Sequence, residues 1–378
     1  MKKTWIVVLL LAMAWSVAAF AEDGADPKSE DDTLAVKLGF YNQRDGKNNF
    51  GGNHFIDENE TVFESIILLD KAITPQDNIN FRFLTDIISS ASISRYHNPQ
   101  FRALQSGASG NKNFVGTLGW QHKWENTTLG LNVSGGKEYA YKSLGYGVTL
   151  SQDLFEKNTN VSLRFQGYND GIKTILFNGF EAQATSRDTY TGEVAINQIL
   201  TPRSIINVAY GHTEQHGMLA TSYNSVFAGG VEGQEIVPYR RHRDSITGRY
   251  KFSFTDSNAV ELGYRYYWDS WHIYSNTAEV RFFQYLWNKK ILLEPNYRYY
   301  LQDRAFFYQQ SFSAFSALQT SDPDLGDFNG NLFGLDLSLL DPHFFTWWRG
   351  DLDFGFNYNL RSDDLNGYWF TAGYTLRF

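Results

Sequence analysis

Charged residues that could line a polar constriction recur at every second position in the second half of the sequence. In the segment 259–269, apolar and aromatic residues alternate with residues that include Glu261, Arg265 and Asp269. Side chains on a β-strand point to opposite faces with a period of two, so these charges share one face. The same parity extends this face along neighbouring segments. Its predicted members are Arg249, Lys251, Glu261, Arg265, Asp269, Glu279, Arg281, Glu294, Arg298, Asp336, Asp351 and Asp353.

Two interpretations of this charged face remain open. Acids and bases on one face of adjacent strands can pair across the strands and stiffen a wall, because an unpaired charge in a confined place is costly. Rings of charged side chains can also select solutes in a pore. We therefore expect either a paired structural lining or a charged constriction.

The histidines do not form a catalytic or metal-binding motif in the sequence. The close pair His212 and His216 lies four residues apart, which on a strand means one face but a separation of about 13 Å. They are therefore not obvious co-ligands. His212 shares the outward parity of Val208 and Tyr210, and a lipid-facing histidine beside a serine would suggest an outer-membrane phospholipase. No matching Ser/Asn motif accompanies it, so a lipid hydrolase is a distant alternative.

Other candidate motifs also favour structural interpretations. The run Ser321–Asp327 carries three carboxylates that could hold Ca²⁺, but it lacks the spacing of an EF-hand loop, which favours a solvated acidic loop. Ser106-Gly-Ala-Ser109 is not a nucleophile elbow, because no helix follows it. The absence of cysteine excludes disulfides and thiolate metal sites. We predict no catalytic residue, no metal and no cofactor.

The final segment indicates which element must position the charged face. From 368 to 378, aromatic and apolar residues alternate with small and polar ones, and the chain ends in Tyr374, Leu376 and Phe378 at alternate positions. A terminal strand leaves unsatisfied backbone groups unless both of its edges are paired, and in lipid only a closed barrel achieves this. The pattern resembles the closing strand of bacterial outer-membrane barrels, whose final phenylalanine is read by the barrel assembly machinery.

The N-terminal segment predicts export from the cytoplasm. Met1-Lys-Lys is followed by an apolar run and by Ala19-Phe20-Ala21 before acidic residues, which is typical of a cleaved signal peptide. No later apolar run approaches the roughly 20 residues that a spanning helix needs. We therefore expect a signal peptide at 1–21, a periplasmic lead-in at 22–32 and an outer-membrane β-barrel at 33–378.

Composition and segment spacing support that fold class. Aromatic residues make up 17% of the chain, and a barrel hides lipid-facing residues by alternating them with polar ones. The alternating segments number about sixteen, and short connections alternate with long ones, as in outer-membrane barrels. We predict short periplasmic turns and long extracellular loops, the longest at 217–241 and 309–329. Aromatic residues in 341–350 suggest a belt at the membrane interface.

Several longer motifs resemble one uncharacterised bacterial family. They are Tyr239-Arg-Arg-His-Arg-Asp244, Tyr264-Arg-Tyr-Tyr-Trp-Asp-Ser-Trp271, Leu200-Thr-Pro-Arg-Ser204, Tyr297-Arg-Tyr-Tyr300 and the Ser106–Ser109 run. The chain is similar to domain of unknown function 3570, a resemblance that implies an outer-membrane barrel and no established activity. The first two segments lie outside these motifs, so their pairing is the least certain part of the predicted fold.

These expectations leave two classes of function. A barrel of this size has room for an aqueous lumen, which predicts a pore or transport-associated channel that is not an enzyme. The alternative is a structural sheath that holds another subunit, such as a redox lipoprotein or a cytochrome. We expect outer-membrane lipid and the assembly machinery as partners. The net charge of −8 argues against nucleic acid.

Overall fold

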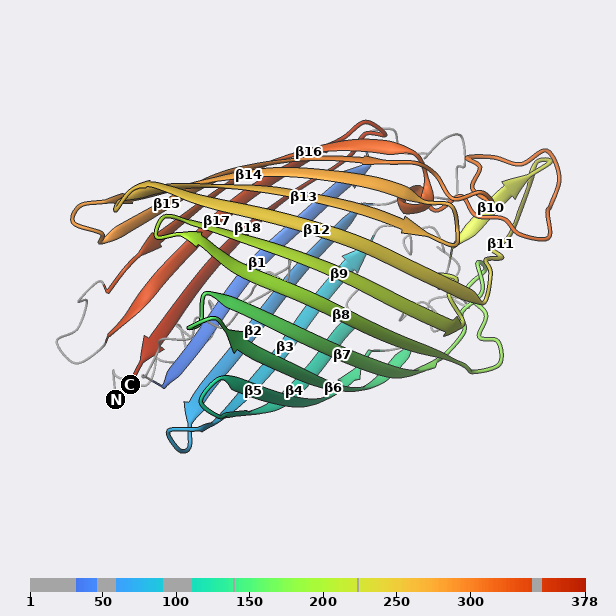
Figure 1. Cartoon of the computed structure of the whole chain (residues 1–378). Helices are drawn as coiled ribbons and strands as arrows, with labels where there is room; N and C mark the ends of the chain where they lie inside the picture. The colour runs from blue at the N-terminus through green and yellow to red at the C-terminus, as the bar shows by residue number, and fades with distance from the viewer. Residues whose placement is uncertain (1–31, 46–58, 91–110, 139, 223, 342–348) are drawn as a thin grey trace, which may run out of the picture.

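The computed structural model describes residues 32–45, 59–90, 111–138, 140–222, 224–341 and 349–378. In these ranges sixteen antiparallel strands form one closed barrel, and β10 and β11 form a separate two-stranded sheet (Figure 1). The predicted fold class is therefore confirmed. The barrel strands are β1 (Thr33–Asp45), β2 (Glu60–Ala72), β3 (Asp77–Ser90), β4 (Asn111–Lys123), β5 (Thr127–Lys137), β6 (Tyr141–Leu154), β7 (Thr159–Ile172), β8 (Thr185–Thr201), β9 (Ser204–Gly217), β12 (Arg240–Thr255), β13 (Asn258–Asp269), β14 (Tyr274–Leu286), β15 (Ile291–Gln302), β16 (Phe328–Leu339), β17 (Arg349–Arg361) and β18 (Leu365–Arg377).

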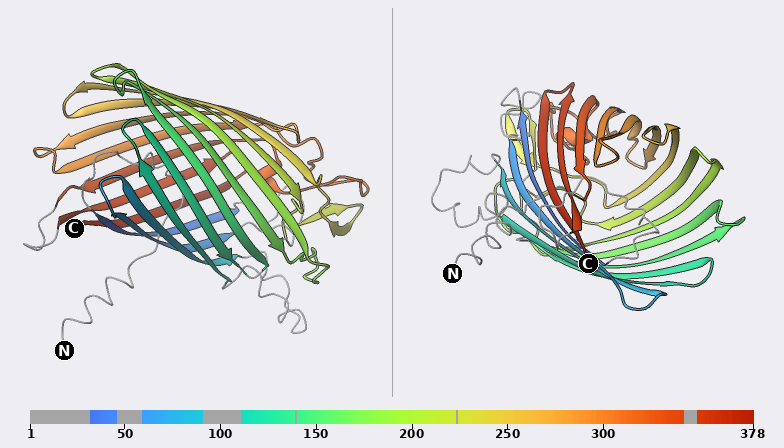
Figure 2. Two further views of the ribbon diagram at one scale, coloured as in Figure 1. Left: turned by 60° about the horizontal axis from the view of Figure 1, so that its bottom comes forward. Right: turned by 90° about the vertical axis from the view of Figure 1, so that its left-hand side faces the viewer.

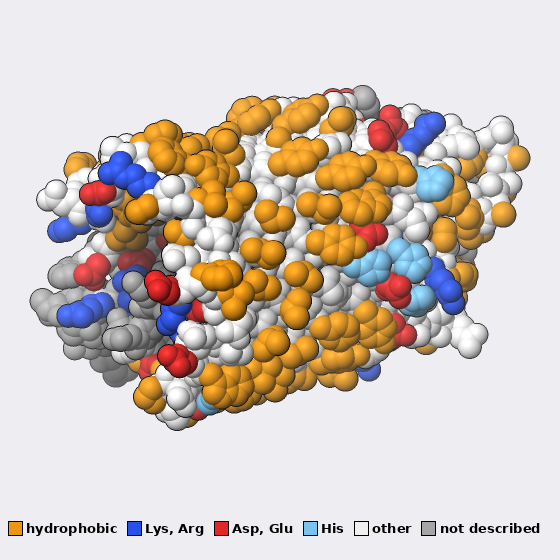
Figure 3. All heavy atoms as spheres, in the orientation of Figure 1, with side chains coloured by type: hydrophobic (Ala, Val, Ile, Leu, Met, Phe, Trp, Pro, Cys, Tyr) orange, Lys and Arg blue, Asp and Glu red, His pale blue; other side chains and the backbone are white. Residues whose placement is uncertain are grey.

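The barrel wall has an apolar outer face because exposed apolar side chains alternate with less exposed residues along many of the strands. On β13, Leu262 and Tyr264 are each 52% exposed, whereas the intervening Gly263 is partly covered. Exposed apolar side chains recur on strand after strand, and on the face seen in Figure 3 they form a broad band across the middle of the barrel. Since adjacent side chains on a strand point to opposite faces, the charged parity of β13 lies on the other side of the wall.

The seam that closes the barrel joins the two ends of the chain. In β1, Phe40 lies opposite Phe63 of β2 on one side and Phe370 of β18 on the other. The rings of Phe370 and Phe356 are 4.8 Å apart between centroids. These aromatic rows border an open hollow of about 910 Å³ on the wall. The structure thus pairs the first strands, which the sequence had left uncertain, by the same outward aromatic parity.

The two ends of the barrel differ in their connections (Figure 2). At the end that holds Thr33 and Arg377, which we call the turn end, neighbouring strands are joined through 73–76, 124–126, 155–158, 202–203, 256–257 and 287–290. At the opposite loop end, the two longest described connections are 218–239 and 303–327. They contain β10 (Ser225–Ala228), β11 (Val231–Gln234) and the 3-10 helix η3 (Pro323–Leu325).

The two long connections pack against each other and form what we call the loop unit, residues 218–239 and 303–327. A buried cluster joins Val237 of the first connection to Ala305, Phe307 and Tyr308 of the second, over Trp271 and Ile273. The second long loop was predicted at 309–329, but that boundary was wrong. The loop begins at residue 303, because β15 ends at Gln302 and Ala305 and Phe307 are buried in the loop unit.

Several predicted features lie outside the described residues. They are the signal peptide at 1–21, nearly all of the lead-in at 22–32, the Ser106–Ser109 run and the core of the aromatic segment, 342–348. Across the described ranges, no helix has the length and apolar character needed to cross a membrane.

Candidate functional site

The charged parity of β14 and β15 brings three predicted residues into direct contact. Glu279 lies opposite Arg298 in the register of the two strands. One carboxylate oxygen, Oε2, accepts from Arg298 Nη2 at 3.0 Å, and the other, Oε1, accepts from Arg281 Nε at 2.7 Å. The Glu279 side chain is 16% exposed, while those of both arginines are more than a third exposed. One acid therefore bridges two bases that remain accessible to solvent.

Further predicted bases lie on the neighbouring strands. Lys251 of β12 is opposite Glu261 of β13, which is opposite Arg281 of β14, so the three form one row across the wall. The Lys251 ammonium also lies 3.6 Å from the centroid of the Phe283 ring. Arg249 is opposite Gly263, and the Arg265 guanidinium lies 5.8 Å from the Tyr267 ring centroid. On β12–β14 the predicted set therefore has four bases and three acids.

Four of the seven predicted acids lie on the adjoining strands β15 to β17. Glu294 of β15 lies directly opposite Asp336 of β16, which places two like charges side by side. Asp353 accepts a hydrogen bond from the Ser338 hydroxyl at 2.6 Å. Asp351 forms an ion pair with Arg377 of β18, a residue absent from the predicted set. On β15 to β17 the predicted set is thus mainly acidic.

Asp269 does not share the open surroundings of the other predicted residues. Its side chain is fully buried, and its Oδ2 accepts from Arg241 Nε at 2.8 Å and from the Tyr267 hydroxyl at 2.7 Å. Its Oδ1 accepts from the backbone N–H groups of Trp271 and Ile273. The guanidinium carbon of Arg241 lies 4.1 Å from the Trp271 ring centroid. These contacts make Asp269 an anchor for the 270–273 connection beneath the loop unit.

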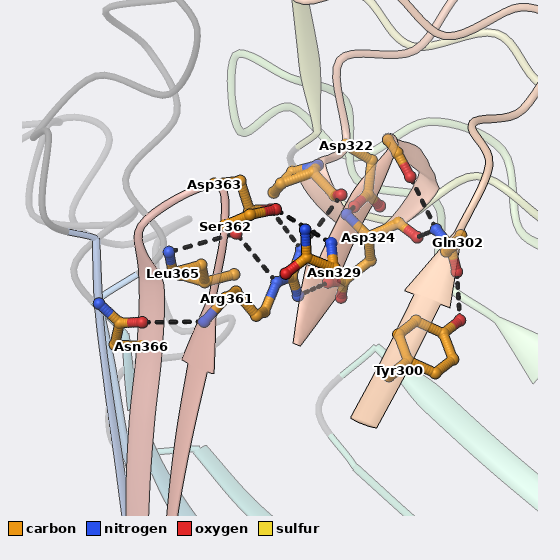
Figure 4. A network of polar contacts seen from close by, with 12 residues as sticks. Tyr300, Gln302, Asp322, Asp324, Asn329, Arg361, Ser362, Asp363, Leu365 and Asn366 are labelled. Carbon is orange, nitrogen blue, oxygen red and sulfur yellow. Dashed lines mark hydrogen bonds and ion pairs between the residues drawn. The ribbon is translucent and has the colours of Figure 1, made fainter. Parts of the chain in front are cut away.

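A second network, which the sequence interpretation missed, holds η3 at the loop end of the barrel (Figure 4). Arg361, the last residue of β17, donates from Nη1 to Asp324 Oδ1 at 2.6 Å and from Nη2 to Asp363 Oδ2 at 2.7 Å. From β15, Gln302 Nε2 donates to the backbone oxygens of Asp324 and Gly326 at 2.9 and 2.8 Å.

Both anchors share the parity of the charged face, since Arg361 follows Asp351 and Asp353 along β17 and Gln302 follows Arg298 along β15. The connection 303–327 is therefore tied to the charged side of the wall rather than to the apolar side. The acidic turn Ser362-Asp363-Asp364 after a basic strand end was the available sequence signal. The other partner of Arg361, Asp324, could not be identified from the sequence, because the position of Asp324 depends on how the connection 303–327 folds.

The loop unit also contains a buried carboxyl group. Glu235 is 3% exposed and accepts from the backbone N–H of Thr221 at 2.9 Å and from the Thr320 hydroxyl at 2.6 Å. Burial raises the pKa of the Glu235 carboxyl, although these hydrogen bonds oppose the shift. Asp322, which the sequence offered as a possible Ca²⁺ ligand, instead caps η3 by accepting from the Asp324 N–H at 2.9 Å.

Taken together, this geometry supplies fixed charges on one side of the barrel wall. Strands β12 to β14 carry arginines whose guanidinium groups remain charged at any physiological pH. The acids Glu294, Asp336, Asp351 and Asp353 lie beside them on the neighbouring strands β15 to β17. The loop unit borders this charged surface at one end of the barrel. Such an arrangement can orient or exclude charged solutes.

Comparison with known proteins gives a family and a fold. The model of the family described as "Protein of unknown function (DUF3570)" matches residues 114–341. No curated protein matches the sequence.

Solved structures match at low sequence identity. A structure titled "Bacterial polysaccharide outer membrane secretin" is 9% identical, with 92% of this chain and 98% of that chain covered and a TM-score of 0.52. A BenF-like porin from Pseudomonas fluorescens Pf-5 is 10% identical, with 92% and 98% covered and a TM-score of 0.47. At these identities the likeness concerns the barrel fold alone.

Proposed function

Because the chain belongs to the DUF3570 family of proteins of unknown function, whose description assigns no activity, we propose a function from the barrel itself. The protein acts as a pore or transport-associated channel in a bacterial outer membrane. The observation that carries this proposal is the division of the wall into an apolar face and a face that carries the predicted acids and bases.

Residence in a membrane follows from the exposed apolar face. Leu118, Val133, Leu144 and Leu163 are each about half exposed on successive strands, as a belt in contact with acyl chains requires. A soluble barrel would leave this surface in water at a large free-energy cost. The short connections then belong on the periplasmic side and the loop unit on the outside. Residues 1–21 act as the export signal and are removed after Ala21.

The size of the barrel supports an aqueous interior. Barrels of about 16 to 18 strands leave a water-filled channel, and the charged face then lines that lumen. Glu279 bridges Arg281 and Arg298, while Glu294 and Asp336 lie side by side. Walls of low dielectric constant focus the field between such regions. Selectivity for solutes by charge, rather than catalysis, is the function that this lumen supports.

The direct test is conductance. Purified protein that shows the heat-modifiable mobility of a folded barrel is inserted into a planar lipid bilayer, and single-channel current and the reversal potential in a KCl gradient are recorded. We expect discrete current steps and a reversal potential that shifts when lumen charges are changed. Folded protein that inserts and never conducts would contradict the proposal.

A second candidate function rests on the position of η3. Arg361 and Gln302 hold Asp324 of the connection 303–327 at the charged side of the wall. This favours a barrel that holds a periplasmic or lipid-anchored partner entering from the turn end. Co-purification of such a partner with the wild-type protein, together with absence of conductance, would support this sheath over the channel.

A further inference from the structure

The outer wall near the loop end carries a cluster of histidines and carboxylates that the channel function does not use. His212 and Glu214 lie on β9, and in the strand register they are opposite Asp244 and His242 of β12. Each ligand atom of His212, Glu214 and His242 lies within 4.8 Å of the others. We propose that these three side chains bind a divalent transition-metal ion of the Zn²⁺ class.

The geometry around Glu214 converges on a single point. Glu214 Oε1 is 3.3 Å from His242 Nδ1 and 3.8 Å from His212 Nε2. Zinc bonds to imidazole nitrogen and carboxylate oxygen are about 2.0–2.2 Å long, so two ligands of one ion are separated by less than twice that length. The distances to Glu214 fall within this limit, and small rotations of the three half-exposed side chains complete the site.

Asp244 fixes the orientation and tautomer that a metal needs. His212 Nδ1 lies 2.7 Å from Asp244 Oδ1, and the same oxygen accepts from the Tyr210 hydroxyl at 2.6 Å. When the neutral imidazole donates its Nδ1 proton to Asp244, its Nε2 presents a lone pair toward Glu214. A lone pair facing a carboxylate oxygen is repulsive unless a proton or a metal cation lies between them. Carboxylate–histidine–metal arrangements of this kind are the usual second shell of zinc sites.

The ligand set and its position define the class of ion. Two imidazoles and one carboxylate suit Zn²⁺ and similar first-row ions better than Mg²⁺ or Ca²⁺, which prefer oxygen ligands. The cluster lies at the edge of the apolar belt, where histidine and acidic side chains gather near the loop end (Figure 3). Its parity is that of Tyr210 and Val208, so the ion is bound on the outer surface and not in the lumen.

The site could not be found by searching for spaced histidines along one strand. The pair His212 and His216 has the wrong separation, and His216 instead reaches the other carboxylate oxygen of Glu214 at 3.5 Å. The second histidine of the site, His242, lies on β12, which follows the connection 218–239 in the sequence and pairs with β9. Only the register of β9 with β12 brings Glu214 and His242 together.

Zinc binding to tag-free, full-length protein in detergent tests the inference. The protein is stripped with a chelator, titrated with Zn²⁺ against a chromophoric competitor, and examined by X-ray absorption at the zinc edge. We expect saturable binding of about one ion per chain with nitrogen and oxygen ligands at about 2.0–2.2 Å. The variants His242→Gln and Glu214→Gln should lose this binding, and Asp244→Asn should weaken it by about 10–100-fold.

A matched control is His122→Gln. His122 lies 2.8 Å from Asp77 at the turn end. Among the described residues this site offers one histidine and one carboxylate and belongs to no group of three metal ligands, so the replacement of His122 should leave zinc affinity unchanged. Heat-modifiable mobility establishes that each variant is folded. Wild-type protein that shows no saturable binding would overturn the inference, as would folded His242→Gln and Glu214→Gln variants that bind zinc as tightly as wild type.

Discussion

The hydroxyl of Thr320 donates a hydrogen bond of 2.6 Å to Glu235 Oε1, and so joins the two long connections of the loop unit through a pair of residues that are both almost completely buried. Glu235 also accepts a hydrogen bond from the backbone N–H of Thr221, so it links two parts of the first connection. Its carboxyl group therefore couples the stability of both connections to its own protonation.

The first prediction is that the loop unit becomes less stable as pH rises. Burial raises the pKa of the Glu235 carboxyl, so the folded state keeps this proton to a higher pH than the unfolded chain does. Stability falls with pH wherever the folded state binds more protons. As pH rises above about 4, the ordinary glutamate value, hydrogen exchange corrected for intrinsic rates should accelerate in 218–239 and 303–327. Glu235→Gln, which is neutral at every pH, should abolish this dependence.

The second prediction concerns ion selectivity. Replacing both Arg281 and Arg298 with glutamine leaves Glu279 unopposed on the charged face, so the reversal potential in a KCl gradient should shift toward cation selectivity. Arg203→Gln is the control, because Arg203 lies in a turn-end connection and donates to the backbone oxygen of Phe254. An unchanged reversal potential in a conducting double variant would mean that these arginines do not border the conducting path.

The third prediction separates anchoring charges from lining charges. Asp269→Ala removes the acceptor of Arg241 at a fully buried pair, which should lower the free energy of unfolding by about 3–5 kcal/mol. Arg298→Ala should cost only roughly 1 kcal/mol, since Glu279 keeps Arg281 and solvent screens the pair. Urea unfolding in detergent or lipid measures both values, with the exposed turn-end substitution Asp256→Ala as a neutral reference. A smaller loss for Asp269→Ala than for Arg298→Ala would refute the distinction.

The fourth prediction concerns the proposed assembly signal Tyr374, Leu376 and Phe378. Phe378→Asp should sharply reduce the amount of heat-modifiable barrel in the outer membrane. The Phe378 ring is 59% exposed, with Lys71 Nζ 5.6 Å from its centroid, so little packing is lost and failed recognition by the assembly machinery is the expected cause. Phe155→Asp introduces the same change at an exposed turn-end position and should assemble normally. Normal yield of the Phe378 variant would remove the basis for an assembly signal here.

Alternation along the strands made most of the barrel predictable. The parity of Glu279, Arg281 and Arg298 followed from period two, and their contacts follow from the pairing of β14 with β15. The loop unit was not predictable in this way, because Glu235 and Thr320 are brought together by chain segments without a regular period. The zinc ligands were hidden for a related reason. The register of β9 with β12 decides whether His242 lies opposite Glu214 or a neighbouring position.

The pairing of β1 with β18 has a kinetic consequence. Thr33 is matched with Arg377, so this contact spans nearly the whole described chain, and the entropy of closing so long a loop must be met before the pair forms. Contacts of such high sequence separation form slowly. Until then, the growing sheet exposes two unpaired edges that can capture strands of other molecules. Closure is therefore the step at which a folding catalyst in the membrane would act most effectively, by holding both edges until the last strand arrives.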